Sequence, residues 1–281
     1  MKDQDCVRFL QEVLPQLRMR WPGFRKVRRQ VCKRIARRVQ ELGLDNVISY
    51  RQHLSEHAGE WQVLDEMCRI TISRFYRDRS VFDFLRDRIL PELAETFGSR
   101  EKTDGALQVW CAGCASGEEP WTLRLVWDLE LQSRYPGLAL QITATDADPH
   151  MLERAANACY GPGSIKDCPA GWRDIAFSKL DADKYRLRNR FRHNVDFLLQ
   201  DVRTEVPAGP FDLILCRHLV FTYFDEVLQC ELLEQWLNRL APGGVLVAGK
   251  QESLPKLAWP GFVEIEPHTG CYRQIPAERE A

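Results

Sequence analysis

The sequence lacks the features that would place the chain in a membrane or direct it out of the cell. No apolar run approaches the roughly 20 residues that a helix needs to cross a bilayer. The first residues, MKDQDCVRFLQ, are charged and contain no apolar signal core. We therefore expect a cytoplasmic protein without membrane insertion, in which the ten cysteines are reduced thiols rather than disulfides.

Internal repeats, low-complexity linkers and the common metal and phosphate signatures are also missing. No Gly-Lys-Ser or Gly-Lys-Thr follows the glycine-rich segment 109–120, which excludes a phosphate loop there. Cys111 and Cys114 form a CxxC pair, but the other cysteines lack the paired spacing of a zinc site. We predict no metal site and interpret these two cysteines as small buried side chains.

Net charge is also low, at −1, but positive charge is concentrated in one stretch near the N-terminus. Between residues 18 and 38 the chain has ten Lys or Arg residues and no acidic residue, which predicts a local basic surface. Nucleic acid is a disfavoured partner, because no set of base-stacking aromatic residues accompanies the stretch. The basic residues are Arg18, Arg20, Arg25, Lys26, Arg28, Arg29, Lys33, Arg34, Arg37 and Arg38.

The first third of the chain has the apolar spacing of helices and no convincing strand. The helix expected from Phe24 to Leu42 has an apolar stripe and ends before Gly43, which we expect to be its C-cap. We interpret residues 1–95 as a basic helical N-terminal domain. The expected helices are 5–20, 24–42, 46–57, 60–72 and 79–96, the last interrupted near Pro91.

The remainder, residues 96–281, alternates apolar runs with helical segments. Four short runs, GALQVWCAG, LALQITATD, GPFDLILCR and PGGVLVAGK, predict strands, and helices are expected at 118–131, 149–158 and 224–240. This alternation predicts an α/β domain with a doubly wound, mainly parallel sheet. Residues 160–195 fit neither pattern and are interpreted as a small inserted subdomain with a few antiparallel strands.

The ends of the predicted strands carry the residues that indicate chemistry. In VWCAGCASGEEP, Gly113 and Gly117 allow a tight turn and a close approach of the backbone to a ligand. Glu118 and Glu119 at the following helix start would repel a phosphate and attract the cationic amino and sulfonium groups of S-adenosylmethionine (SAM). The alternative is a glycine-rich turn with a charged cap.

Two further strand ends are acidic. In TATDADP, Asp146 is the candidate for binding both hydroxyls of a ribose, and Asp148 is either the alternative or the N-cap before Pro149. Asp201 in LLQDVR follows another expected strand and is placed to accept a hydrogen bond from an adenine amino group. Polar residues at three consecutive strand ends favour a nucleotide-like cofactor over chance.

With these motifs in order, the chain resembles the chemotaxis receptor methyltransferase (CheR) family over about residues 24–255. The shared segments include RRVQELGLDNVISYRQHL in the helical part. In the second part they are ITISRFYRD, CASGEEPW, ATDAD, GPFDLILCRH, YFD and PGGVLVAG. The resemblance implies a Rossmann-like domain that binds SAM, releases S-adenosylhomocysteine (SAH), and methylates a glutamate carboxylate on a chemoreceptor.

The resemblance also implies roles for individual residues. Arg77 and Tyr223 would stand beside the methyl group and the acceptor carboxylate, which needs no base because it is already a nucleophile. The implied cofactor contacts are Ser73, Arg77, Ala112, Gly113, Glu118 at the methionine end, Asp146 at the ribose, Asp201 near the adenine, Arg217 and His218. Structural alternatives are a salt bridge of Arg77 with Asp78 or Asp83, and a core position for Tyr223.

The chain departs from the family pattern around the acceptor. His218 occupies the place of the usual Asn after Cys-Arg, one extra residue precedes Tyr223, and Lys250-Gln251-Glu252 replaces His-Ser-Glu. His218 is therefore either a stand-in for the Asn or a general base for an amine, thiol or hydroxyl acceptor. Three functions follow: a chemoreceptor methyltransferase docked to an acidic helical protein through Arg34, Arg37 and Arg38, a small-molecule methyltransferase, or a non-catalytic SAM-binding module.

Overall fold

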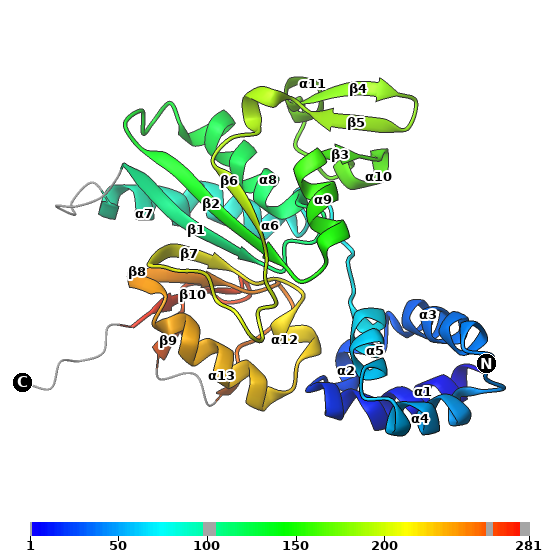
Figure 1. Ribbon diagram of the computed structural model, residues 1–281. Helices are drawn as coiled ribbons and strands as arrows, with labels where there is room; N and C mark the ends of the chain where they lie inside the picture. Colours follow the sequence, from blue (N-terminus) through cyan, green and yellow to red (C-terminus); the bar gives the residue numbers. More distant parts are fainter. Residues whose placement is uncertain (1, 98–104, 257–260, 276–281) are drawn as a thin grey trace, which may run out of the picture. The chain divides into compact units, whose positions relative to one another are not determined.

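The computed structural model describes residues 2–97, 105–256 and 261–275 (Figure 1). Contacts divide the chain into two compact units, Met1–Ile70 with Thr222–Leu228, and Thr71–Phe221 with Gln229–Ala281. The helices of residues 79–97 therefore belong to the second unit, whereas the sequence predicted a domain boundary at 95/96. Among the described residues no helix is long and apolar enough to span a bilayer.

The first unit is helical, as expected. Asn46 caps α4, because its side chain accepts hydrogen bonds from the N–H groups of Ile48 and Ser49, and Gly43 follows α3 with a φ of +65°. The single helix expected over 24–42 is split by a turn at 25–27. The elements are α1 (Asp3–Val13), η1 (Leu14–Leu17), α2 (Trp21–Phe24), α3 (Arg28–Glu41), α4 (Val47–Glu56) and α5 (Glu60–Cys68).

A disulfide joins Cys6 of α1 to Cys32 of α3. This corrects the expectation that all cysteines are reduced, although the other eight are free thiols. The physical reason is the packing of α1 against α3, which brings the two Cα atoms to 5.9 Å, within the range that a disulfide spans. Helical periodicity alone does not show which cysteines of two helices face each other.

The second unit contains a seven-stranded sheet in the order β6-β2-β1-β7-β8-β10-β9. The first five strands pair in parallel, and β10 runs antiparallel to both β8 and β9. This confirms the doubly wound α/β prediction, with an antiparallel edge added. The strands are β1 (Ala106–Ala112), β2 (Ala139–Asp146), β6 (Val195–Leu199), β7 (Phe211–Leu215), β8 (Leu240–Val247), β9 (Phe262–Glu264) and β10 (Cys271–Gln274).

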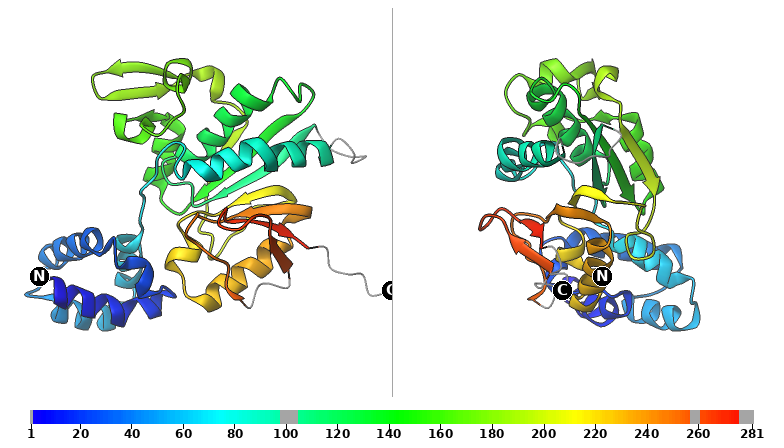
Figure 2. Two further views of the ribbon diagram at one scale, coloured as in Figure 1. Left: turned by 180° about the vertical axis from the view of Figure 1, so that it is seen from behind. Right: turned by 90° about the vertical axis from the view of Figure 1, so that its left-hand side faces the viewer.

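Helices cover both faces of this sheet (Figure 2). The helix formed by α6, η2 and α7 lies on one face and α13 on the other. The expected interruption near Pro91 is absent. The wider π-turn η2 immediately precedes this proline and accommodates a residue that has no N–H to donate. The helices are α6 (Arg79–Phe84), η2 (Leu85–Ile89), α7 (Leu90–Phe97), α8 (Glu118–Val126), η3 (Trp127–Leu131), α9 (Pro149–Asn157), α12 (Val220–Tyr223) and α13 (Glu226–Leu237).

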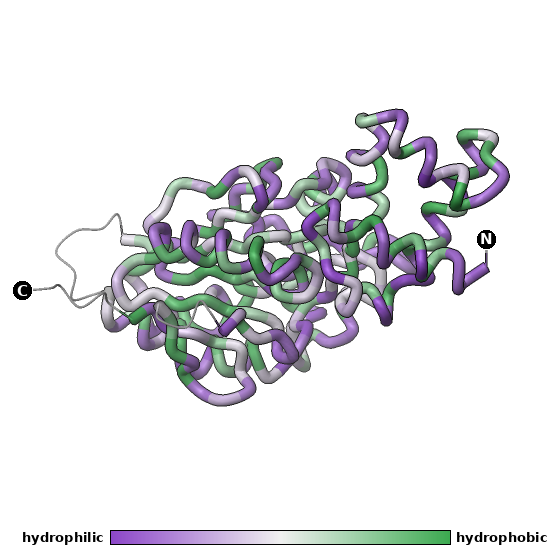
Figure 3. Tube along the Cα trace, turned by 90° about the horizontal axis from the view of Figure 1, so that it is seen from below, coloured by the Kyte–Doolittle hydropathy of each residue, from purple (hydrophilic) through white to green (hydrophobic). Residues whose placement is uncertain are grey.

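The core of the second unit lies between the sheet and its helices. The sheet of the second unit consists mostly of apolar residues, whereas the helices of the first unit alternate between polar and apolar residues (Figure 3). Three tryptophans, Trp110, Trp127 and Trp236, are fully buried and fill the largest volumes. Burial on this scale fixes the strand ends that form the site.

The inserted subdomain is a small antiparallel sheet in the order β3-β5-β4, which agrees with the expected antiparallel strands. Trp172 of α11 and Phe177 of β4 are buried beneath it. Its elements are β3 (Cys159–Tyr160), α10 (Pro162–Ile165), α11 (Trp172–Ala176), β4 (Phe177–Asp181), β5 (Lys184–Leu187) and η4 (Asn189–Phe191).

Candidate functional site

The strand order reverses between β1 and β7 in the second unit, because β2 and β6 extend the sheet from β1 and β8 extends it from β7. In doubly wound sheets ligands bind at this point, beyond the carboxyl ends of the strands. The segments that leave these ends are 113–118 after β1, 146–148 after β2 and 216–219 after β7. All three contain residues singled out from the sequence.

The glycine loop after β1 is fixed to the neighbouring strand. The N–H groups of Gly113 and Cys114 both donate to the carbonyl of Thr145, at 2.8 and 2.9 Å. Gly117 has a φ of +85°, and a Cβ there would lie 2.7 Å from the Cβ of Ala155 in α9. Glycine is therefore required at position 117 by its backbone conformation and by the close approach of α9. The sequence predicted only the other reason, a close approach of the backbone to a ligand.

Asp146 at the end of β2 joins this loop to the next one. Its carboxylate accepts hydrogen bonds from the N–H of Ala115 at 2.8 Å and from the N–H of Asp148 at 2.9 Å. Asp148 accepts from the N–H groups of His150 and Met151. It is therefore the N-cap of α9, which confirms the helix-cap interpretation of this residue. The arrangement holds the Asp146 carboxylate at the strand end, where a ribose would bind.

Glu118 is buried without a counter-ion. It is 1% exposed, and its two oxygens accept from the hydroxyls of Ser116 at 2.8 Å and Ser164 at 3.2 Å. Within residues 2–97, 105–256 and 261–275, no Lys, Arg or His forms an ion pair with it. A buried carboxylate is stable only when its charge is compensated, so this site suits a ligand that brings a positive charge.

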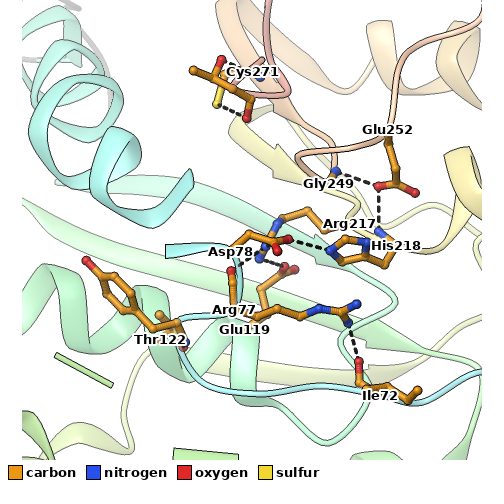
Figure 4. Close-up of polar contacts among 12 residues, drawn as sticks. Ile72, Arg77, Asp78, Glu119, Thr122, Arg217, His218, Gly249, Glu252 and Cys271 are labelled. Atoms are coloured by element: carbon orange, nitrogen blue, oxygen red, sulfur yellow. Dashed lines mark hydrogen bonds and ion pairs between the residues drawn. The ribbon is translucent and has the colours of Figure 1, made fainter. Parts of the chain in front are cut away.

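Arg217, just after β7, is the centre of an ion network (Figure 4). Its side chain is 3% exposed and donates to Glu119 at 3.0 Å and to Asp78 at 2.9 Å. Its guanidinium also lies over the Phe82 ring, 4.9 Å from the centroid. Burial raises the pKa of Glu119, while the charge of Arg217 opposes that shift. The network fixes the start of α8 against the end of β7.

His218 is held in one orientation by its neighbours (Figure 4). Its Nε2 lies 2.7 Å from Asp78 Oδ2, and its backbone has a φ of +59°. Glu252 stabilises this backbone, because one carboxylate oxygen accepts from the N–H groups of both His218 and Gly249, at 2.8 and 2.6 Å. The hydrogen bond from His218 and the nearby Arg217 charge lower the pKa of Asp78.

The other predicted cofactor residues have mixed surroundings. Arg77 is half-buried and donates to the carbonyl of Ile72 at 2.6 Å, and its own carbonyl accepts from Arg217. Ser73 lies in the extended segment before it, and Ala112 is buried as the last residue of β1. Asp201 follows β6 and forms a two-pronged ion pair with Arg203, with contacts of 3.0 and 2.6 Å.

Tyr223 groups with the first compact unit. Its ring packs against Phe24 with centroids 5.0 Å apart, and its carbonyl accepts from the N–H of Arg20 at 2.8 Å. The core position expected as its structural alternative is therefore present, with Phe24 as the aromatic neighbour. Its place beside the transferred methyl stays a prediction.

The basic stretch of the first unit divides into internal and exposed side chains. Arg34 donates to the carbonyls of Met67 and Arg69, and Arg38 forms a two-pronged pair with Glu60 at 2.9 and 2.8 Å. Carboxylates from outside the stretch compensate four of its ten charges: Arg18, Arg28, Arg37 and Arg38 pair with Asp225, Asp3, Glu41 and Glu60.

Four basic residues of the stretch are exposed and form no ion pair within the described part of the chain. These residues, defined here as the exposed basic surface, are Arg25, Lys26, Arg29 and Lys33.

Sequence reasoning missed several residues of the site. The motifs did not predict that Asp78 and Glu119 are partners of Arg217, or that Glu252 binds the backbone of His218. No sequence motif pointed to Ser164. The signal available in the sequence was the clustering of Glu118, Glu119 and Arg217 at strand ends, but their partners are distant in the chain.

A family match over most of the second unit defines the class of the protein, and the fold and the site agree with it: it is a SAM-dependent methyltransferase. The loop glycines, the Asp146 carboxylate at a strand end and the buried, uncompensated Glu118 fit a cofactor with a ribose and a cationic amino acid end. Residues 71–265 match the SAM-binding domain of CheR methyltransferases, and the chain belongs to that family.

Curated relatives with known names are similar over most of their length. A probable chemotaxis protein methyltransferase of Rhizobium etli is 28% identical over 228 residues, covering 79% of this chain and 83% of the relative. The chemotaxis protein methyltransferase of Listeria monocytogenes is 30% identical over 203 residues, covering 72% and 73%. That of Escherichia coli is 29% identical over 238 residues, covering 82% and 78%.

Proposed function

We propose that the acceptor is a carboxylate, the glutamate side chain of a chemoreceptor. The observation that carries the proposal is the family match over residues 71–265, joined by relatives that are named chemotaxis protein methyltransferases. The exposed basic surface supports it, because four cations that form no ion pair with any described residue suit an acidic helical protein.

The cofactor would be held by residues from three strand ends. Glu118 faces the cationic methionine end, Asp146 the ribose and Asp201 the adenine region, where its oxygens would be shared with Arg203. Ser73, Ala112 and Gly113 complete the walls in this proposal. Arg217 and His218 act from the end of β7, where their network fixes the backbone that faces the cofactor.

The proposed chemistry needs orientation more than acid or base. SAM supplies an activated methyl group on a sulfonium. The acceptor carboxylate forms the new O–CH3 bond as the S–CH3 bond breaks, and neutral SAH leaves. Arg77 would hold the carboxylate through its planar fork of donors, and Tyr223 would orient it by a hydrogen bond. Proximity of this kind supplies several kcal/mol in comparable reactions, up to about 7–11 kcal/mol.

A second candidate, a small-molecule methyltransferase, is favoured by one observation. The 2.7 Å contact of His218 with Asp78 resembles the carboxylate–imidazole pairs that orient a general base. An amine, thiol or hydroxyl acceptor must lose a proton, whereas a carboxylate has none to lose at neutral pH. The two candidates therefore differ in the acceptor and in the importance of the exposed basic surface.

Charge reversal on the exposed basic surface separates them. Arg29→Glu with Lys33→Glu changes two exposed side chains of α3, whereas reversal of Arg34 and Arg38 would break internal contacts. With labelled SAM and receptor fragments, we expect roughly tenfold lower activity at low salt, about 1.4 kcal/mol, and a weaker salt dependence than the wild type. The matched control is Arg239→Glu with Lys256→Glu, exposed positions in the second unit.

Full activity of the folded Arg29/Lys33 variant on receptor fragments at low salt would contradict the docking role. Transfer to small amines, thiols or acids with no transfer to receptor fragments would replace the first candidate by the second.

A further inference from the structure

The inserted subdomain directly contacts the glycine loop that follows β1. Ser164 in α10 donates from its hydroxyl to one oxygen of Glu118 at 3.2 Å, and Ser116 of the loop itself donates to the other at 2.8 Å. Tyr160 in β3, 2% exposed, donates to the carbonyl of Ser116 at 2.9 Å. Two residues of the insertion thus reach the loop that precedes α8.

The backbone of Ser164, which carries this hydroxyl, is held in place from two sides. Its carbonyl accepts from the N–H of Phe75 at 2.9 Å, and its own N–H donates to Gly161 at 3.0 Å, which closes the α10 turn. The Phe75 ring packs edge-on against Tyr160, with centroids 4.8 Å apart. The segment that carries Ser73 and Arg77 is therefore joined to the same turn of the insertion.

The two serine hydroxyls leave the Glu118 carboxylate partly unsatisfied. A carboxylate has about four acceptor sites, and donors from the described part of the chain occupy two of them, both neutral hydroxyls. Because each oxygen is bonded on one side, the remaining lone pairs point in fixed directions. A cationic amino group would complete this arrangement through a charge-assisted hydrogen bond.

We propose that Ser164 is a positioning residue for the methionine end of the cofactor and acts through Glu118. The proposal rests on the role of Glu118 proposed above. It makes the inserted subdomain a structural part of the cofactor site, in addition to any docking surface that it presents. Removal of the Ser164 hydroxyl lets the carboxylate turn and weakens its hold on the amino group.

Calorimetry with two ligands tests this role. SAH carries the amino acid end, whereas 5′-methylthioadenosine keeps the adenosine and the sulfur and lacks that end. For Ser164→Ala we expect SAH to bind about tenfold more weakly, the scale of one hydrogen bond to a charged group, and methylthioadenosine to bind as in the wild type. Ser164→Thr retains the hydroxyl and should restore SAH binding.

The matched control is Ser178→Ala, a half-buried serine of β4 in the same subdomain, which should change neither affinity. Equal weakening of both ligands by Ser164→Ala would overturn the proposal and indicate general loosening of the site. The same holds if Ser164→Ala leaves SAH affinity unchanged while Glu118→Gln lowers it. If Glu118→Gln itself leaves SAH affinity unchanged, the proposed role of Glu118 fails first.

Discussion

Glu118 and Glu119 are neighbours in the sequence, both lie at the start of α8, and their surroundings differ. Glu119 is paired with Arg217 at 3.0 Å, whereas Glu118, among the residues that the structure describes, accepts only from the hydroxyls of Ser116 and Ser164. The first carboxylate belongs to a closed ion network that also includes Asp78 and shapes the end of β7. The comparison teaches that a buried carboxylate with an internal cation maintains structure, whereas one bonded to neutral hydroxyls alone is suited to a ligand that brings a positive charge.

The largest effect should come from opening the closed network. Arg217→Met keeps the length of the side chain but leaves Asp78 and Glu119 without their cation. We expect the free energy of unfolding to fall by about 3–5 kcal/mol, the range for breaking a buried ion pair by removing one partner. Urea unfolding followed by circular dichroism measures it. Arg217→Lys should recover part of the loss, and a decrease below about 1 kcal/mol would show that the network is not structural.

A smaller effect, on binding instead of stability, should follow from neutralising the other carboxylate. Glu118→Gln keeps the shape: its amide oxygen can accept from one of the two serines, and its NH2 group can donate to the hydroxyl of the other. We expect SAM and SAH to bind about thirtyfold more weakly, close to 2 kcal/mol, as for a lost hydrogen bond to a charged group. Because no cation is left unpaired, the free energy of unfolding should not fall. Unchanged affinity in calorimetry would remove the contrast between the two glutamates.

The smallest effect should appear in the pH dependence of stability. The hydrogen bond from His218 and the charge of Arg217 lower the folded-state pKa of Asp78. Its carboxylate therefore stabilises the fold above the ordinary Asp pKa, near 4, and this contribution disappears as pH falls from there toward the lower folded-state pKa. We expect Asp78→Asn to be less stable by roughly 1.5 kcal/mol at pH 7 and nearer the wild type at pH 3. A difference that is equal at both pH values would contradict this assignment.

The sequence predicted the sheet unit well because its signals are local. Each apolar run is short and ends at a turn, so the strands of β1, β2, β7 and β8 and the positions of Asp146 and Glu118 at or near their ends could be derived from neighbouring residues. The residues that contact these positions could not be derived in this way. Arg217 meets Asp78 across 139 positions of sequence and Ser164 meets Glu118 across 46, and only the folded backbone brings them together.

The basic stretch shows the opposite limit of sequence reasoning. Helical spacing placed Arg34 and Arg38 outside the apolar stripe, which is correct as a statement about α3 alone. It does not show that Glu60 and the carbonyls near the end of α5 lie beside that face. A long basic side chain at the edge of an apolar stripe can bind either an acceptor within the protein or a partner protein. For Arg34 and Arg38, the packing of α5 beside α3 provides the internal acceptors.

The bond between Cys6 and Cys32 makes a covalent ring of the residues between them. Six of the ten basic residues, from Arg18 to Arg29, lie inside that ring, and Lys33 follows it directly. A protease that cuts after Arg or Lys finds several of its sites there, yet a single cut would leave both fragments attached. Most of the exposed basic surface is therefore carried on a segment that can be nicked without being lost, for as long as its two cysteines stay oxidised.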